Sequence, residues 1–103
     1  MLITLKNILP KSLKFDAVGA LDVEVVGLTF DSRMVDRGFC FFAIKGTQVD
    51  GHQFIATAID KGASVIVCEQ MPAEKSPKTT YIEVEDASYA LGLMASAFYG
   101  NPS

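Results

Sequence analysis

Apolar positions recur at helical spacing in three parts of the chain. The first part, residues 2–9, predicts a short N-terminal helix that ends near Pro10. The second part begins at Phe54 and predicts a helix that ends before Gly62. The third part runs over residues 87–98, where Asp86 precedes the apolar stripe as a good N-cap and Gly100 follows it.

Four shorter apolar segments have the length and pattern of strands. Residues 22–30 and 79–84 alternate between apolar and polar side chains, whereas residues 39–44 and 64–68 are continuously apolar, which is typical of strands buried on both faces. The order of strands and helices predicts an α/β fold, a small three-layer domain with a mainly parallel sheet. We expect residues 1–103 to form one domain.

Composition narrows the functional classes. Half of the residues are hydrophobic and a fifth are charged, as in a globular domain with a real core. The net charge of -3 and the absence of a basic run argue against a general nucleic-acid partner. No apolar run is long enough to span a bilayer, and the first residues lack a signal peptide. We therefore expect no membrane partner and a cytoplasmic location.

The two cysteines, Cys40 and Cys68, lie inside apolar runs and predict buried, reduced thiols. Neither has a nearby cysteine or histidine at zinc-ligand spacing. We expect no metal site in this chain.

The loop over residues 46–51 has the glycine spacing of a phosphate-binding P-loop. His52 and Gln53 stand where a P-loop has lysine and Ser or Thr, so we reject an ATP site here. The loop still offers glycine backbone, the Thr47 hydroxyl and the Gln48 amide, and it leads into a helix whose N–H groups favour an anion. An ordinary strand-to-helix connection explains it equally well.

A second candidate, Asp31-Ser32-Arg33, follows directly on a predicted strand. The Ser32 hydroxyl and N–H suit a phosphate, with Arg33 nearby as a cation. Alternatively, Asp31 and Ser32 cap the next turn while Arg33 makes a structural ion pair. Ser32 is the better ligand candidate, because it is small and lies where α/β sheets bind ligands.

His52 is the only histidine and invites a hydrolase triad with Ser32 and a nearby aspartate. The sequence has no Gly-x-Ser-x-Gly elbow, so we interpret His52 as a turn or capping residue and predict no catalytic residue in this chain.

Residues 29–69, TFDSRMVDRGFCFFAIKGTQVDGHQFIATAIDKGASVIVCE, resemble the N-terminal domain of the Mur ligases. Within that family they are most similar to the UDP-N-acetylmuramoyl-tripeptide synthetases, which add the third residue of the peptidoglycan stem peptide. The motifs that carry the resemblance fall in the family's order; they are Asp31-Ser32-Arg33, Gly38 to Gly46, Asp50-Gly51-His52 and Gly62-Ala63.

The resemblance implies that this domain binds the UDP end of UDP-N-acetylmuramoyl-L-alanyl-D-glutamate. Carried over by position, the UDP contacts fall on Phe30 and Ser32 after the first strand and on Thr47, Gln48 and Val49 in the loop. It also implies a missing second domain that binds ATP and magnesium, and a third that receives meso-diaminopimelate or L-lysine.

We therefore expect residues 1–103 to be an excised domain, inactive alone and without a cofactor of its own. Two alternatives remain open. One is the corresponding domain of the ligase branch that acts on the tripeptide precursor (MurF), and the other is a non-enzymatic interaction module on the same scaffold.

Overall fold

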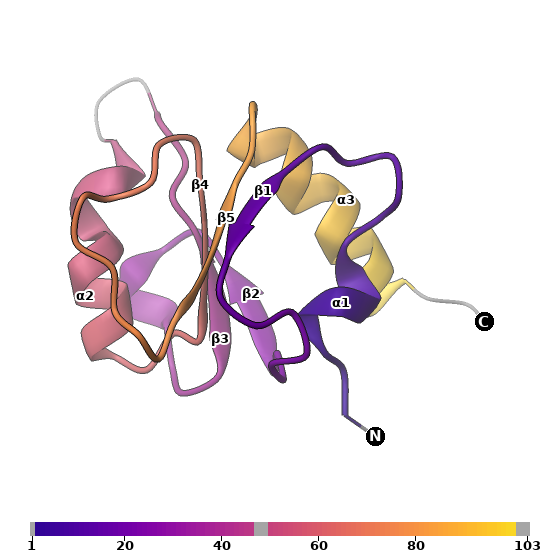
Figure 1. Cartoon of the computed structure of the whole chain (residues 1–103), viewed down its shortest axis with the longest axis horizontal. Helices are drawn as coiled ribbons and strands as arrows, with labels where there is room; N and C mark the ends of the chain where they lie inside the picture. The colour runs from indigo at the N-terminus through magenta and orange to yellow at the C-terminus, as the bar shows by residue number, and fades with distance from the viewer. Residues whose placement is uncertain (1, 47–49, 101–103) are drawn as a thin grey trace.

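The computed structural model describes residues 2–46 and 50–100, and within them the chain forms one five-stranded sheet (Figure 1). The sheet order is β1-β5-β4-β3-β2. The four strands β2 to β5 run parallel, and β1 pairs antiparallel with β5 at one edge. The strands are β1 (Asp16–Val18), β2 (Gly27–Thr29), β3 (Phe39–Phe42), β4 (Val65–Cys68) and β5 (Thr80–Glu83). The expected α/β fold with a mainly parallel sheet is confirmed.

Helices cover both faces of this sheet, which gives the three predicted layers. Helix α2 lies on one side, and α1 and α3 lie on the other (Figure 1). Two short 3₁₀ helices complete the fold: η1 follows β2, and η2 directly precedes α2. The helical elements are α1 (Leu5–Ile8), η1 (Ser32–Met34), η2 (Gly51–Phe54), α2 (Ile55–Asp60) and α3 (Ala87–Tyr99).

The apolar run FCFF supplies both cores from one strand. Phe41 points into the core beneath α2, whereas Cys40 and Phe42 point into the core beneath α1 and α3. All three side chains are fully buried. Successive strand residues face opposite sides, so a strand in the middle layer must be apolar throughout, as the sequence predicted.

Two helix ends predicted from the sequence are confirmed, namely the start of α3 after Asp86 and the end of α2 before Gly62. Asp86 caps α3, because its carboxylate accepts the Tyr89 N–H at 3.1 Å. Gly62 ends the turn after α2 with φ +108°, where a side chain would be strained and its Cβ would approach the Arg37 backbone to 2.8 Å.

Two predicted elements differ in length, and one strand was not predicted. The first helix is only the single turn of α1, and the strand expected over residues 22–30 is limited to β2. Strand β1 escaped prediction because all three of its residues are exposed, so no apolar alternation marks it. No helix in the described part of the chain has the length and apolar character needed to cross a membrane.

Candidate functional site

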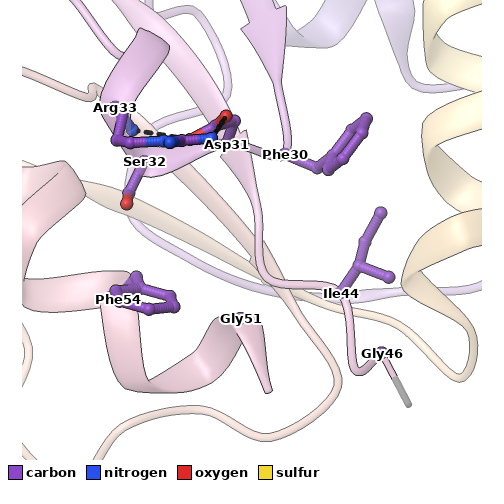
Figure 2. Close-up of a pocket in the computed structure, with 8 residues that line it drawn as sticks. All are labelled: Phe30, Asp31, Ser32, Arg33, Ile44, Gly46, Gly51 and Phe54. Atoms are coloured by element: carbon purple, nitrogen blue, oxygen red, sulfur yellow. Dashed lines mark hydrogen bonds and ion pairs between the residues drawn. The ribbon is translucent and has the colours of Figure 1, made fainter. Parts of the chain in front are cut away.

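A pocket of about 610 Å³ opens where β2 and β3 end, which is the edge where parallel α/β sheets bind ligands (Figure 2). The segment after β2, the segment after β3 and η2 form its walls. The residues that line it are Phe30, Asp31, Ser32, Arg33, Ile44, Gly46, Gly51 and Phe54. The fold therefore brings together the two segments that the sequence singled out separately.

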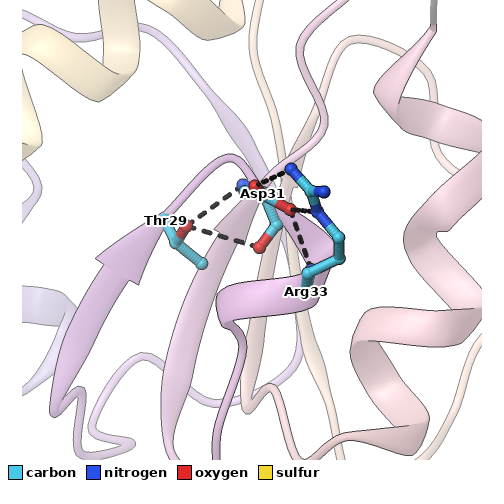
Figure 3. A network of polar contacts seen from close by, with 3 residues as sticks. All are labelled: Thr29, Asp31 and Arg33. Atoms are coloured by element: carbon cyan, nitrogen blue, oxygen red, sulfur yellow. Dashed lines mark hydrogen bonds and ion pairs between the residues drawn. The ribbon is translucent and has the colours of Figure 1, made fainter.

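Asp31 and Arg33 fix the turn that carries Ser32 (Figure 3). The Asp31 Oδ1 accepts the Arg33 backbone N–H at 2.9 Å, which caps η1. Arg33 closes a two-point ion pair on the same carboxylate, from Nε at 3.1 Å and from Nη2 at 2.9 Å. The Thr29 hydroxyl accepts the Asp31 N–H at 3.0 Å and ties the turn to the end of β2. The structural alternative for Asp31 and Arg33 is thus confirmed.

The ion pair sets the charges at this wall of the pocket. The hydrogen bonds from the Arg33 side chain and backbone lower the pKa of Asp31, and the Asp31 carboxylate raises the pKa of Arg33. Both groups are therefore ionised near neutral pH. Since the Arg33 side chain is 85% exposed, water screens the pair, and its main effect is geometric.

Ser32 is the first residue of η1 and stays outside this network, at least among the described residues. Its side chain lies in the pocket wall and points toward Phe54 on the opposing segment (Figure 2). A hydroxyl is both donor and acceptor, and a free one is available to a ligand. Of the three side chains in Asp31-Ser32-Arg33, that of Ser32 is the one without a hydrogen bond to another described residue.

Two exposed aromatic rings give the pocket its apolar character. Phe30 is 63% exposed and Phe54 is 36% exposed, and their side chains approach the cavity from different segments (Figure 2). Ile44 lies near Phe30. The resemblance to the Mur ligases pointed to Phe30. The sequence pattern placed Phe54 in a helix stripe and Ile44 in a strand, and neither was predicted to line a site. The sequence feature that could have identified Phe54 as a pocket residue is its position as the first apolar residue after a glycine-rich loop.

The base of the loop between β3 and η2 is held by backbone contacts. The Gly51 N–H donates to the Ile44 carbonyl at 2.9 Å, and Lys45 and Asp50 form an isolated β-bridge. A Cβ on Gly51 would lie 2.7 Å from the Ile44 nitrogen, so glycine is needed for close approach to the chain itself. Gly51 is not among the described glycines with positive φ, so this close contact, and not a left-handed backbone, accounts for glycine here.

Three of the five residues predicted to contact UDP, Thr47, Gln48 and Val49, lie outside the described residues. Their roles stay predictions. The other two, Phe30 and Ser32, both line the pocket.

His52 is a turn residue, as predicted. Its Nδ1 lies 2.7 Å from Asp50 Oδ1, and its Nε2 accepts the backbone N–H of Glu69 at 3.0 Å. Asp50 caps η2 by accepting the His52 N–H, and this bond contributes most to the lowered pKa of Asp50. Because both ring nitrogens are engaged and His52 does not line the pocket, a triad with Ser32 is excluded.

The cysteines are free and buried, as expected. Burial raises the pKa of Cys40, and burial together with the Glu83 carboxylate raises the pKa of Cys68 to about 11. Both are therefore neutral thiols of the core. Within residues 2–46 and 50–100, no group of three or more His, Cys, Asp or Glu side chains is arranged to hold a metal ion.

Comparisons with known proteins give a consistent result. A family profile described as "Mur ligase family, catalytic domain" matches residues 24–99. The UDP-N-acetylmuramoyl-L-alanyl-D-glutamate--2,6-diaminopimelate ligase of Bacteroides fragilis is 46% identical over 96% of this chain and 20% of its own length. The ligase of the same name from Cytophaga hutchinsonii is 43% identical over 96% of this chain and 21% of its own length. The chain thus spans about a fifth of these curated relatives.

Solved structures agree with the sequences. The MurF ligase of Thermotoga maritima in complex with ADP matches 72% of this chain and 17% of its own chain, with TM-score 0.61 and 31% identity. A MurF structure from Acinetobacter baumannii covers 72% of this chain and 16% of its own, with TM-score 0.63 and 28% identity. Sequence profile, curated relatives and fold together place this chain in the Mur ligase family.

Proposed function

We propose that this chain is the N-terminal domain of a Mur ligase and binds the UDP end of a UDP-N-acetylmuramoyl peptide. The observation that carries the proposal is the pocket after β2 and β3, where the Ser32 hydroxyl, which bonds to no other described residue, lies among exposed aromatic rings. A nucleoside diphosphate has a flat, partly apolar base at one end and anionic oxygens at the other. The pocket offers a matching group to each end.

The apolar side of the pocket suits the base and ribose. Phe30 and Phe54 present ring faces or edges to a flat heterocycle, and stacking on an aromatic side chain contributes about 1–3 kcal/mol per base in nucleic-acid complexes. Ile44 closes the cavity beside Phe30. We propose that the base enters between these side chains.

The polar side of the pocket suits the diphosphate. The Ser32 hydroxyl donates to a phosphate oxygen, and Arg33, paired with Asp31, fixes the turn that presents this hydroxyl. In this proposal Thr47, Gln48 and Val49 supply the remaining contacts to UDP. The network around Asp31 holds the turn in place before a ligand arrives, which lowers the entropic cost of binding.

This chain does not fit ATP and magnesium. The glycine-rich loop lacks the P-loop lysine and hydroxyl, and no metal-binding cluster is present among the described residues. We propose that ATP and magnesium are bound by another domain of a longer protein, that amide bond formation takes place there, and that residues 1–103 alone have no ligase activity.

The more specific proposal is that the ligand carries the dipeptide L-alanyl-D-glutamate and that the ligase adds the third stem-peptide residue. The names of the curated relatives at 43–46% identity specify that substrate, whereas the solved MurF structures are 28–31% identical. The higher identity favours the dipeptide branch. Comparing the activity of the full-length protein on dipeptide and tripeptide precursors separates the two.

Titration of the 103-residue chain with UDP, followed by NMR and calorimetry, tests the binding proposal. We expect saturable shifts of the Ser32, Gly46 and Gly51 amides, and no comparable shifts with ATP at the same concentration. Ser32→Ala removes one hydrogen bond to phosphate, so we expect Kd to rise about tenfold, with unfolding stability changed by less than about 0.5 kcal/mol. Ser88→Ala, an exposed serine on α3, is the matched control. Equal affinity of the two variants would exclude Ser32 as a contact.

A further inference from the structure

Asp50 and His52 do not line the nucleotide pocket, yet both side chains make hydrogen bonds beside it. The His52 side chain is only 18% exposed. Its Nε2 accepts two backbone N–H groups at the end of β4, from Glu69 at 3.0 Å and from Gln70 at 3.3 Å. These partners are 17 and 18 residues away in the chain, so the ring joins two separate parts of the fold.

The hydrogen bonds define the tautomer of the ring. A nitrogen that accepts N–H bonds carries no proton, so Nε2 is bare and the proton of the neutral ring is on Nδ1. That proton is donated to Asp50 Oδ1 at 2.7 Å. The same oxygen accepts the His52 backbone N–H at 2.9 Å, which fixes the carboxylate as well. Asp50 therefore orients the ring, and the ring binds the end of β4.

This link acts on the wall of the pocket through η2. Gly51 is placed between Asp50 and His52, and its N–H donates to the Ile44 carbonyl at the end of β3. Among the described residues, the start of η2 is thus attached to the segment after β3 by the Gly51–Ile44 bond and the adjacent Lys45–Asp50 bridge, and to the end of β4 by the His52 ring. If the ring lost its bonds to the end of β4, the contacts with the segment after β3 would have to hold Gly51 without that second attachment.

We infer that His52, oriented by Asp50, is a positioning residue that ties η2 to the end of β4 and so fixes the Gly51 wall of the nucleotide pocket without touching the nucleotide. The inference rests on the proposed function, because it predicts an effect on UDP affinity. It also gives a role to the Asp50-Gly51-His52 motif that the UDP contacts leave unexplained.

Two substitutions separate the bond between His52 and Asp50 from the bonds between His52 and the end of β4. In His52→Gln, the amide oxygen reaches the place of Nε2 and can still accept from Glu69 and Gln70. In His52→Asn, the shorter amide reaches the place of Nδ1 and can still donate to Asp50, but nothing reaches β4. Gln53→Ala changes an exposed neighbour on η2 and serves as the matched control.

The test measures UDP affinity of each folded variant by calorimetry and amide exchange of Gly51 and Glu69 without ligand. We expect H52N to raise the Kd for UDP about tenfold, while H52Q and Q53A stay within about twofold of the unsubstituted chain. Exchange at Gly51 and Glu69 should accelerate in H52N only. A purely structural role would lower unfolding stability and leave the affinity of the folded chain unchanged.

The outcomes distinguish this inference from the proposed function. If the unsubstituted chain binds UDP and H52N binds equally well, the positioning role is wrong and the binding proposal stands. If H52Q loses as much affinity as H52N, the link to β4 is not what matters, which also overturns the inference. If the unsubstituted chain does not bind UDP, the proposed function fails and the predicted effect on affinity fails with it.

Discussion

Replacing Gly51 by alanine tests whether contact between η2 and the end of β3 shapes the pocket. An ideal Cβ at Gly51 would lie 2.7 Å from the Ile44 nitrogen, 2.9 Å from the Ile44 oxygen and 3.1 Å from the Ala43 carbonyl carbon. All three are backbone atoms and cannot rotate away. The methyl group must therefore push η2 outward and stretch the 2.9 Å bond from the Gly51 N–H to the Ile44 carbonyl.

The expected cost follows from these contacts. Overpacking a closely packed site costs about 1–3 kcal/mol, and weakening one backbone hydrogen bond adds about 1 kcal/mol. We expect Gly51→Ala to lower the free energy of unfolding by about 2–4 kcal/mol, which a domain with a typical stability of about 5–15 kcal/mol survives. Urea denaturation of the 103-residue chain, followed by circular dichroism, measures the change.

Gly92→Ala is the matched control, because it adds the same methyl group in open space. Apart from its chain neighbours and the backbone of its own helix, no heavy atom lies within 4 Å of its ideal Cβ, and the residue is inside α3. Alanine in a helix interior is better than glycine by about 0.5–1 kcal/mol, so G92A should unfold at higher urea concentration. If G51A were as stable as the unsubstituted chain, the close contact of η2 with β3 would not exist as described.

Three further predictions concern the N-cap of α3, the loss of stability in acid and the reactivity of the two cysteines. Asp86→Ala should cost about 1 kcal/mol of unfolding free energy and Asp86→Asn much less; equal urea midpoints for all three proteins would contradict the cap. Since the pKa of Asp50 is lowered in the folded chain, its contribution to stability is present above the ordinary carboxyl pKa and is lost as pH falls through the folded value. Asp50→Asn should therefore flatten the loss of stability in acid, and an unchanged acid titration would refute this. Cys40 and Cys68 should resist iodoacetamide at pH 8 in the folded chain and react in urea, because burial keeps both thiols neutral and inaccessible; rapid labelling without urea would show that the core is open.

The central part of the fold was predictable because burial leaves a local mark. The run FCFF must be a strand buried on both faces, and the stripe after Asp86 must be a helix on one face. Exposed β1 has no such mark, since its position depends on pairing with β5. Such pairing between segments that are distant in the sequence leaves no local pattern from which β1 could be predicted.

For the candidate site, the sequence predicted one part of the pocket and missed others. Ser32 was found because a small polar residue directly after a strand is a recognised place for a ligand contact. Phe54 was missed because an apolar residue at the start of a helix stripe is usually core, and only the fold shows it facing the cavity. The bonds from Glu69 and Gln70 to His52 join residues 17 and 18 positions apart in the chain, and no local sequence pattern predicts them.

Intermolecular NOEs between UDP and the 103-residue chain test the central claim most directly. The account predicts NOEs from the uracil H5 and H6 and the ribose H1′ protons to the rings of Phe30 and Phe54 and to the Ile44 methyl groups. NOEs to the exposed rings of Tyr89 and Tyr99 on α3, with none to the pocket after β2 and β3, would contradict it.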